Sequence, residues 1–369
     1  MPIDPDKSPV ANEFGAQLPP AERLAALRMI DANANRASEG LRVIEDVCRF
    51  YLNDANLSRE HKQLRHELSE LLCPLSPSLL ATARDTATDV GTAITTPEEQ
   101  RRGSMRSVAL ASSKRVEQAL RVIEEQAKLL GLAEASRLEA LRYRAYTLAK
   151  AWTLVEHHRD RLSGTQLYVL IDGRESEQAL VELAGKLIRA GVDLIQLRDK
   201  SLDDRTLLAR ARALRRLIPV GSRPLLVIND RPDLALLAGA DGVHVGQEEL
   251  TVGDVRKVVG PELLVGVSTH TIEQARQAVF DGASYIGCGP TFPSKTKRFE
   301  DFPGPAFLKQ VADEIGLPAF AIGGITQSNL SEVLATGFTR VAVSGSITEG
   351  VDAEEEARLM LQKLRMRRE

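Results

Sequence analysis

The spacing of hydrophobic residues changes once along this chain, near residue 160. Before that point apolar side chains recur at helical spacing, as at Leu41, Ile44 and Val47, and strand-like alternation is scarce. Beyond residue 165 short apolar runs alternate with segments of helical period, a rhythm typical of repeated βα units. We therefore predict three parts: a flexible tail (1–20), a mainly α-helical domain (21–160) and an α/β domain (165–369).

Eight apolar runs in the α/β domain are predicted to be β-strands: 167–171, 194–197, 225–228, 242–245, 263–267, 285–288, 319–322 and 341–343. Eight strands in about 200 residues match the compact end of the (β/α)8, or TIM, barrel. A doubly wound open sheet would need fewer strands and a reversal of strand order. We therefore predict a TIM barrel whose active site lies at the carboxyl ends of its strands.

The helical region repeats part of its own sequence. Residues 36–46 read RASEGLRVIED, and residues 115–125 read RVEQALRVIEE. Leu41 and Ile44 of the first copy recur as Leu120 and Ile123 of the second. The simplest account is an internal duplication, in which two related helical hairpins bury equivalent faces against each other.

Composition narrows the class of protein. The formal net charge of −3, with 27% charged residues, gives no support to a nucleic-acid or anionic-membrane partner. No segment reaches the roughly 18 apolar residues of a membrane-spanning helix. The widely spaced Cys48, Cys73 and Cys288 are expected to be buried free thiols in a reducing cytosol. We expect a soluble cytoplasmic protein whose partners are small molecules, with a homo-oligomer left open.

Basic and amide side chains end the second predicted strand. Gln196, Arg198 and Lys200 alternate along the chain there, so period two points all three into the barrel. Two cations and an amide suit a diphosphate and the ring that it carries. An inner-layer salt bridge with an acid of a neighbouring strand is the structural alternative.

Carboxylates follow the third and fourth predicted strands. Asn229 and Asp230 end the third strand, and Glu249 follows the fourth. Mg²⁺ prefers oxygen ligands from one or two carboxylates together with substrate phosphates, so we predict one Mg²⁺ per active site here. The alternatives are a helix N-cap for Asp230 and a first-turn helix charge for Glu249.

The later strands end in hydroxyls, glycines and a lysine. These residues are Ser268 after the fifth strand, Ser294, Thr296 and Lys297 after the sixth, Gly323 and Gly324 after the seventh, and Ser344 and Gly345 after the eighth. The loops after strands seven and eight of such barrels commonly hold phosphate on free backbone N–H groups. His244 and His270 are expected to pack or form hydrogen bonds rather than act as bases.

Six motifs, in this order, carry a family resemblance: QLRDK, NDRPDLAL, DGVHVGQEE, GVSTHT, GCGPTFPSKTK and AIGGI. Over about residues 165–350 the chain resembles thiamine-phosphate synthase. The resemblance implies a transferase that joins 4-amino-2-methyl-5-(diphosphooxymethyl)pyrimidine to 4-methyl-5-(2-phosphooxyethyl)thiazole. The products would be thiamine phosphate and pyrophosphate.

The resemblance also implies a role for each matching residue. It assigns the pyrimidine diphosphate to Gln196, Leu197, Arg198, Asp199, Lys200, Asn229, Ser268 and Lys297, of which Arg198, Lys200, Ser268 and Lys297 are expected to be catalytic. It assigns Mg²⁺ to Asp230 and Glu249, and the thiazole phosphate to Ser294, Lys295, Thr296, Gly324, Ser344 and Gly345. This chain departs from the usual family pattern at Glu249, where Asp is usual, at Ser294, where Thr is usual, and at Ser344-Gly345.

The charges of these binding residues and of Mg²⁺ predict the order of the reaction steps. Mg²⁺ and the basic side chains would stabilise the departing pyrophosphate, and the electron-rich aminopyrimidine tolerates positive charge at its methylene. Departure of pyrophosphate is therefore expected to precede or dominate attack by the thiazole nitrogen.

Other interpretations remain open at this point. The helical region resembles an extension fused to some thiamine-phosphate synthases and proposed to be a hydroxymethylpyrimidine-phosphate kinase, but a dimerisation or docking module explains the duplication equally well. The barrel could instead belong to a tautomerase-like relative that binds only thiazole phosphate, or act as a thiamine-phosphate sensor. The cations at Arg198 and Lys200 and the acids at Asp230 and Glu249 disfavour the tautomerase.

Overall fold

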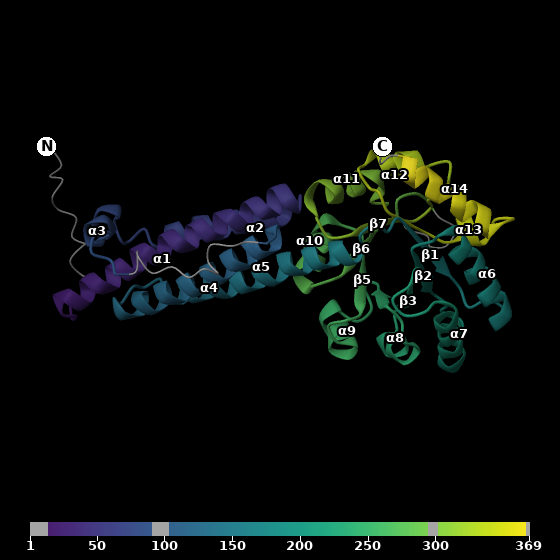
Figure 1. Ribbon diagram of the computed structural model, residues 1–369, viewed down its shortest axis with the longest axis horizontal. Coiled ribbons are helices and arrows are strands. Elements are labelled where there is room, and N and C mark those ends of the chain that lie inside the picture. The colour runs from purple at the N-terminus through teal and green to yellow at the C-terminus, as the bar shows by residue number, and fades with distance from the viewer. Residues whose placement is uncertain (1–13, 91–102, 294–301, 367–369) are drawn as a thin grey trace. The chain divides into compact units, whose positions relative to one another are not determined.

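The computed structural model describes residues 14–90, 103–293 and 302–366 (Figure 1). The chain divides into two compact units, Met1–Thr153 and Leu154–Glu369, and each is described by itself. The division falls inside helix α5 (Ala135–Arg161), which also contains the polar residues 156–160. Within the described ranges, no helix is long and apolar enough to cross a membrane.

The first unit is built from helices. They are α1 (Pro20–Asp46), a short π-helix η2 (Val47–Tyr51), α2 (Ala55–Leu71), α3 (Pro77–Ala83), α4 (Met105–Leu129) and the first part of α5. Three of these helices begin at side chains that accept a hydrogen bond from a backbone N–H, namely Asp54 before α2, Ser76 before α3 and Ser104 before α4. Helix α1 packs along both α4 and α2 (Figure 1). The predicted helical architecture is confirmed.

The two copies of the repeated sequence bury equivalent positions. Leu41 and Leu120 are each 1% exposed, and Ile44 and Ile123 are equally buried. The first copy lies in α1 and the second in α4, the two helices that pack most extensively in this unit. Gly40 permits this approach, because a Cβ there would lie 2.7 Å from Cγ2 of Val116.

The duplication extends to a buried ion pair in each copy. Glu45 accepts hydrogen bonds from Arg42, three residues earlier, and from Arg65 of α2, each at 3.3 Å. Its equivalent Glu124 accepts from Arg121 at 3.0 Å and from Arg142 of α5 at 2.7 Å. Both carboxylates are buried, so each hairpin needs these cations to offset the loss of hydration.

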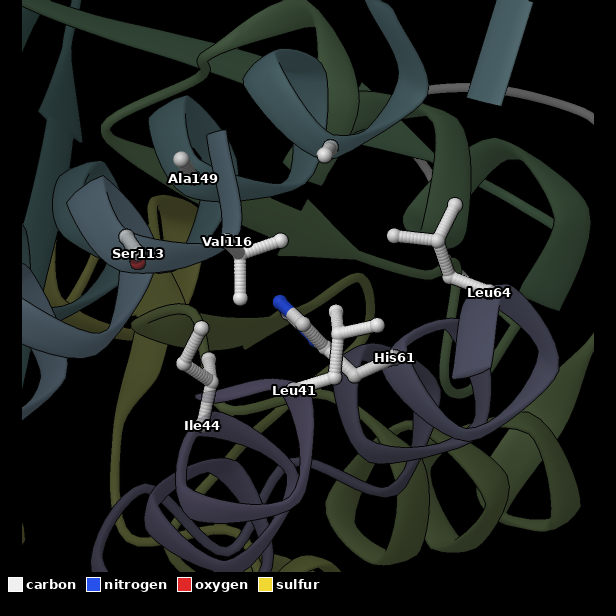
Figure 2. A pocket seen from close by; sticks show the side chains of 8 residues that line it. Leu41, Ile44, His61, Leu64, Ser113, Val116 and Ala149 are labelled. Carbon is white, nitrogen blue, oxygen red and sulfur yellow. The ribbon is translucent and has the colours of Figure 1, made fainter. Parts of the chain in front are cut away.

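A small cavity lies among α1, α2, α4 and α5 (Figure 2). Its lining is mostly apolar and includes Leu41, Ile44, Leu64, Val116 and the imidazole of His61. His61 is 2% exposed, its Nδ1 lies 2.8 Å from the carbonyl oxygen of Leu57, and burial lowers its pKa to about 4. A volume of about 10 Å³ has room for a single water, so this cavity is not a nucleotide site.

The second unit is a closed barrel of eight parallel strands in chain order (Figure 1). The strands are β1 (Leu167–Ile171), β2 (Leu194–Leu197), β3 (Leu225–Asn229), β4 (Gly242–Val245), β5 (Leu264–Thr269), β6 (Tyr285–Cys288), β7 (Ala319–Ile322) and β8 (Val341–Val343). The predicted TIM barrel is confirmed. The strands begin and end where predicted, except that β3 ends one residue later and β5 begins one residue later and ends two residues later.

Helices surround the barrel and connect its strands. They are α6 (Glu177–Ala190), α7 (Asp204–Leu217), α8 (Pro232–Ala238), α9 (Val252–Val259), α10 (Ile272–Asp281), α11 (Gly304–Glu314), α12 (Leu330–Ala335), α13 (Gly345–Thr348) and α14 (Ala353–Arg365). Glycine ends several of them in the left-handed conformation, for example Gly191 with φ +88° and Gly282 with φ +84°. The polypeptide then turns back directly into the next strand.

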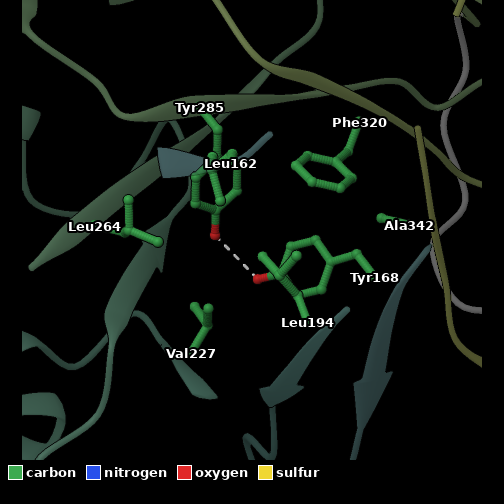
Figure 3. Close-up of a cluster of buried hydrophobic side chains, with 8 residues drawn as sticks. All are labelled: Leu162, Tyr168, Leu194, Val227, Leu264, Tyr285, Phe320 and Ala342. Atoms are coloured by element: carbon green, nitrogen blue, oxygen red, sulfur yellow. Dashed lines mark hydrogen bonds between the residues drawn. The ribbon is translucent and has the colours of Figure 1, made fainter. Parts of the chain in front are cut away.

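The barrel interior is filled by side chains at alternate strand positions. A cluster of Leu162, Tyr168, Leu194, Val227, Leu264, Tyr285, Phe320 and Ala342 is almost fully buried (Figure 3). Tyr168, Tyr285 and Phe320 meet edge to face, with ring centroids 5.4–5.9 Å apart. The interior is therefore a packed core that supports the strand ends from below.

One expectation about the cysteines is wrong. Cys48 and Cys288 are buried as predicted, but Cys73 is exposed. Cys73 follows the end of α2, in a turn where its N–H donates to the carbonyl oxygen of Glu70. Burial of a small thiol depends on its place in the fold, which its spacing in the sequence does not reveal.

Candidate active site at the carboxyl ends of the strands

Three charged side chains meet at the mouth of the barrel. The ammonium of Lys200, which follows β2, lies 3.1 Å from Oδ2 of Asp230 after β3 and 3.4 Å from Oε1 of Glu249 after β4. The Lys200 side chain is 55% exposed and the two acids are 21% and 29% exposed. The hydrogen bond to Asp230 raises the pKa of Lys200, so the ammonium stays charged. This ion-pair cluster is accessible to solvent and does not lie in the inner layer of the barrel.

The backbone holds both acids away from helix-capping roles. Asp230 has φ +60°, in the left-handed region, and its N–H donates to the carbonyl oxygen of His244. Helix α8 begins after it with Arg231 as the N-cap, which makes no capping hydrogen bond through its side chain. Glu249 lies ahead of Thr251, the N-cap of α9. The two structural alternatives for these acids are therefore excluded.

A glycine makes room for the Glu249 carboxylate. A Cβ built on Gly246 would lie 2.2 Å from Oε2 of Glu249, closer than any real contact. Because Gly246 has no side chain, the carboxylate can fold back over the end of β4 toward Lys200. The glycine is thus part of what brings the second acid to the cluster.

A hydrogen-bonded chain of side chains crosses the interior just below this cluster. The amide Nε2 of Gln196 donates to the hydroxyl of Tyr168, which lies 3.0 Å from the hydroxyl of Tyr285. The Tyr285 hydroxyl is 3.3 Å from Nδ1 of His244, and Nε2 of His244 is 3.1 Å from Oγ of Ser268. Burial lowers the pKa of His244 to about 4, so the imidazole is neutral at pH 7. As predicted, His244 forms hydrogen bonds.

The other residues predicted near the diphosphate are placed as follows. The side chains of Arg198 and Asn229 make no hydrogen bond or ion pair to any residue within the described ranges, and both are partly exposed. Asp199 instead holds its own loop, accepting from the backbone N–H groups of Gly173 and Ser201 at 3.0 and 2.8 Å. Leu197 is buried in β2, so only its backbone could reach a ligand.

The loop after β6 lies against the end of β7. The N–H of Thr291 donates to Ile322, and the N–H of Phe292 donates to Gly323, at 2.9 and 3.0 Å. Gly324 has φ +65°, and a Cβ there would lie 2.6 Å from the carbonyl oxygen of Pro293. Only glycine fits this contact without strain. Ser294, Lys295, Thr296 and Lys297 of the predicted site lie outside the described residues.

The end of β8 completes the rim. The hydroxyl of Ser344 donates to the carbonyl oxygen of Leu170 at 2.9 Å, and Gly345 begins the short helix α13. The Ser344 side chain therefore ties β8 to β1. The next residue, Gly345, lies close to the carboxylate of Glu349, because a Cβ at Gly345 would be 3.0 Å from Oε1 of Glu349.

Sequence reasoning did not assign the two tyrosines to this site. Tyr168 and Tyr285 each lie in an apolar strand, and both phenols point into the barrel (Figure 3). A hydroxyl at an inward position of a buried strand needs a hydrogen-bond partner. A tyrosine in an apolar strand therefore indicates that other polar groups lie inside the barrel. The partner itself comes from another strand and could not be predicted from spacing.

The donor set at the barrel mouth fits a divalent cation of the magnesium kind. Asp230 and Glu249 converge on one positive charge, the Lys200 ammonium, which stands where a cation would be held between them. Two carboxylates with room for substrate oxygens are the usual protein contribution to Mg²⁺ binding. No group of three or more His, Cys, Asp or Glu side chains that could hold a metal occurs in the part of the chain that the structure describes.

The fold and this cluster together define a (β/α)8-barrel enzyme with a charged site at its strand ends. A family model described as thiamine monophosphate synthase matches residues 167–347, and a model of the ThiD2 family matches residues 28–151. The chain belongs to the thiamine-phosphate synthases, which are transferases, and it carries an additional N-terminal ThiD2 domain.

Individual relatives resemble the chain over most of its length. A thiamine-phosphate synthase of Rhodopirellula baltica is 46% identical over 336 residues, which cover 89% of each chain. One from Thermosynechococcus vestitus is 39% identical, covering 94% of this chain and 97% of its own. A solved thiamine phosphate pyrophosphorylase from Pyrococcus furiosus is 30% identical with a TM-score of 0.49, covering 55% of this chain and 96% of that one. The resemblance stated from the six motifs is confirmed.

Proposed function

We propose that this chain condenses 4-amino-2-methyl-5-(diphosphooxymethyl)pyrimidine with 4-methyl-5-(2-phosphooxyethyl)thiazole, forming thiamine phosphate and releasing pyrophosphate. The observation that carries the proposal is the meeting of Lys200, Asp230 and Glu249 at the barrel mouth, in a chain 46% identical to a thiamine-phosphate synthase. A cation and two acids that meet at one exposed point suit a diphosphate bound together with a metal ion.

The pyrimidine diphosphate is assigned to the β2, β3 and β5 ends and to the loop after β6. Arg198 and Lys200 would grip the diphosphate with Lys297, and Ser268 would donate to it. Gln196 and Asn229 would bind the ring, while Leu197 and Asp199 contribute through the backbone and by holding the loop. The Arg198 side chain, with no partner among the described residues, is available for an anion.

Asp230 and Glu249 would hold one Mg²⁺. When bound, the metal ion supplies positive charge against the departing pyrophosphate. The longer side chain of Glu249, compared with the usual Asp, is accommodated because its carboxylate lies over Gly246.

The thiazole phosphate is assigned to the loops after β6, β7 and β8. Its binding residues would be Ser294, Lys295, Thr296, Gly324, Ser344 and Gly345. The loop after β6 is tied by hydrogen bonds to Ile322 and Gly323, so residues of these loops share one side of the barrel mouth. Backbone N–H groups at Gly324 and Gly345 would donate to the phosphate.

Charge determines the order of the reaction steps. The bond between the methylene carbon and the diphosphate oxygen breaks with its electron pair leaving on pyrophosphate. Arg198, Lys200 and Lys297 stabilise that negative charge, and the aminopyrimidine ring delocalises the positive charge left on carbon. The thiazole nitrogen then donates its lone pair to the methylene. The barrel aligns the two reactants, and no covalent enzyme intermediate is needed.

Pyrophosphate release should need both substrates and the metal ion. We expect pyrophosphate to form when both substrates and Mg²⁺ are present, and to fall by at least about 100-fold when EDTA removes the metal. A coupled pyrophosphate assay measures this directly. Release that is unchanged by EDTA would contradict the metal assignment, and binding of thiazole phosphate without any turnover would favour the tautomerase-like or sensor alternatives.

We propose a second activity for the helical unit, phosphorylation of hydroxymethylpyrimidine phosphate. The ThiD2 match over residues 28–151 favours it over a purely dimerising module. Full-length protein with Lys200→Ala, in which the barrel reaction is suppressed, should still form ADP from ATP when the pyrimidine phosphate is supplied. If ADP formation is no faster than without the pyrimidine phosphate, the helical unit is not this kinase.

Self-association of the chain and its location in the cytoplasm are also part of the proposal. A small-molecule biosynthetic enzyme without a membrane-spanning helix in the described ranges is compatible with both. Sedimentation of the purified chain would measure its oligomeric state.

A further inference from the structure

The hydrogen-bonded chain below the barrel mouth joins five different strands. Gln196 of β2 donates to Tyr168 of β1, which meets Tyr285 of β6 at 3.0 Å. Tyr285 meets His244 of β4 at 3.3 Å, and His244 meets Ser268 of β5 at 3.1 Å. Its two end residues, Gln196 and Ser268, are both assigned to the pyrimidine diphosphate, whereas the three residues between them have no assigned role.

The orientation of the Gln196 amide, with Nε2 toward Tyr168, and a count of the protons together give the direction of these hydrogen bonds. Each phenol carries one proton, and Tyr168 already accepts from Gln196, so its own proton must go to Tyr285. Tyr285 then donates to Nδ1 of His244. A neutral imidazole with an accepting Nδ1 carries its proton on Nε2, which donates to Ser268. The reverse order would require the Gln196 amide to be rotated, with Oε1 accepting from the Tyr168 hydroxyl.

This direction determines whether Gln196 and Ser268 donate or accept a hydrogen bond when a ligand binds. Ser268 uses its oxygen to accept from His244, so its own proton is free to be donated. Gln196 uses its N–H toward Tyr168, and its Oε1 is a buried acceptor with no hydrogen-bond partner among the described residues. Gln196 is only 1% exposed, so an acceptor left unpaired there needs a partner from a ligand.

The barrel is shaped to allow the central contact of this chain. A Cβ on Gly266 of β5 would lie 2.2 Å from the Tyr285 ring and 2.5 Å from Nδ1 of His244. Gly287 of β6 also faces the imidazole, with 3.4 Å from a Cβ to Cε1. Two glycines at inward strand positions thus make space where Tyr285 and His244 meet.

We infer that Tyr168, Tyr285 and His244 are positioning residues that fix the hydrogen-bond polarity of Gln196 and Ser268, and thereby select a ring bearing an amino group and an anionic leaving group. The inference depends on the proposed function, because it takes the pyrimidine diphosphate as the ligand. An amino group needs the Gln196 acceptor, and a diphosphate oxygen needs the Ser268 donor. Hydrogen bonds that all donate in the direction from Gln196 to Ser268 satisfy both requirements.

The first test is Tyr285→Phe in the full-length protein. Without the Tyr285 hydroxyl, the Tyr168 proton can be accepted only by Oε1 of Gln196, so the amide rotates and presents N–H to the ring. The preference in kcat/KM for the natural substrate over an analogue with hydrogen in place of the amino group should fall about tenfold. Tyr143→Phe, at an exposed tyrosine of the helical unit, is the matched control and should keep the preference.

Two results separate this inference from the proposed function. A folded Tyr285→Phe protein with unchanged preference overturns the positioning role alone. A wild-type protein that does not distinguish the two substrates overturns the assignment of the ring to Gln196, and the inference with it.

The second test observes the hydrogen-bonded side chains in the wild-type protein. Nitrogen-15 NMR of histidine-labelled wild-type protein reports which ring nitrogen of His244 carries the proton, and His244→Gln identifies the signal by its loss. We expect the proton on Nε2 at pH 7. A proton on Nδ1 would reverse the direction of the chain and overturn the inference, even if Tyr285→Phe fails to fold.

Discussion

Replacing Lys200 with alanine should lower kcat by about 100-fold to 1,000-fold while leaving the barrel folded. The ammonium is the described cation that contacts both acids of the cluster, at 3.1 and 3.4 Å, so its loss removes positive charge from the place where pyrophosphate departs. The side chain is 55% exposed, so little packing is lost. Steady-state pyrophosphate release and a thermal unfolding curve measure the two effects.

Lys257→Ala supplies the matched control. Lys257 also pairs with an acid, Asp254 at 2.7 Å, but on the outer surface of α9. An ion pair this exposed to solvent contributes little to stability and lies away from the barrel mouth, so this variant should keep wild-type turnover. Equal rates for the Lys200 and Lys257 variants would remove Lys200 from the catalytic set.

Replacing Asp230 with asparagine should reduce kcat/KM by at least about 100-fold and raise the Mg²⁺ concentration needed for half-maximal activity about tenfold or more. Asparagine keeps the shape of the side chain and tolerates the left-handed backbone, φ +60°, that this position requires. The substitution therefore isolates the carboxylate charge. Activity measured across a magnesium titration gives both quantities.

Asp230→Ala would mix two effects. Alanine also loses the carboxylate, but it disfavours positive φ by roughly 1–2 kcal/mol, so its melting temperature should fall below that of the asparagine variant. Asp254→Asn, on the surface of α9, serves as the control for the charge change alone. If Asp230→Asn shows wild-type magnesium dependence, Asp230 does not ligate the metal.

The strands could be predicted from sequence because both of their faces are buried. A strand inside a (β/α)8 barrel contacts the core on one side and the helices on the other, so it reads as a short continuous apolar run. Residues 167–171 are such a run, and four of the five are buried in β1. The polar residues that follow, such as Lys200 and Asp230, then fall at the same end of the barrel because all strands are parallel.

What could not be predicted depends on contacts between distant segments. The polar residues near the end of α5 suggest a turn, yet His158 is buried and its Nε2 lies 3.3 Å from the hydroxyl of Ser284. The helix therefore continues to Arg161. In the same way, a sequence places His244 and Tyr285 on separate strands, and only the closed barrel shows that Gly266 leaves space for them to meet.

The paired acids of the helical unit bear on how this half of the chain arose. Glu45 and Glu124 each take an arginine from their own helix and another from the helix that follows, so each hairpin neutralises its acid without help from the other copy. A lone hairpin of this kind would lack only a cover for its apolar face, which an identical molecule could provide across a twofold axis. The helical unit therefore holds within one chain a contact between related hairpins that two identical molecules could also make.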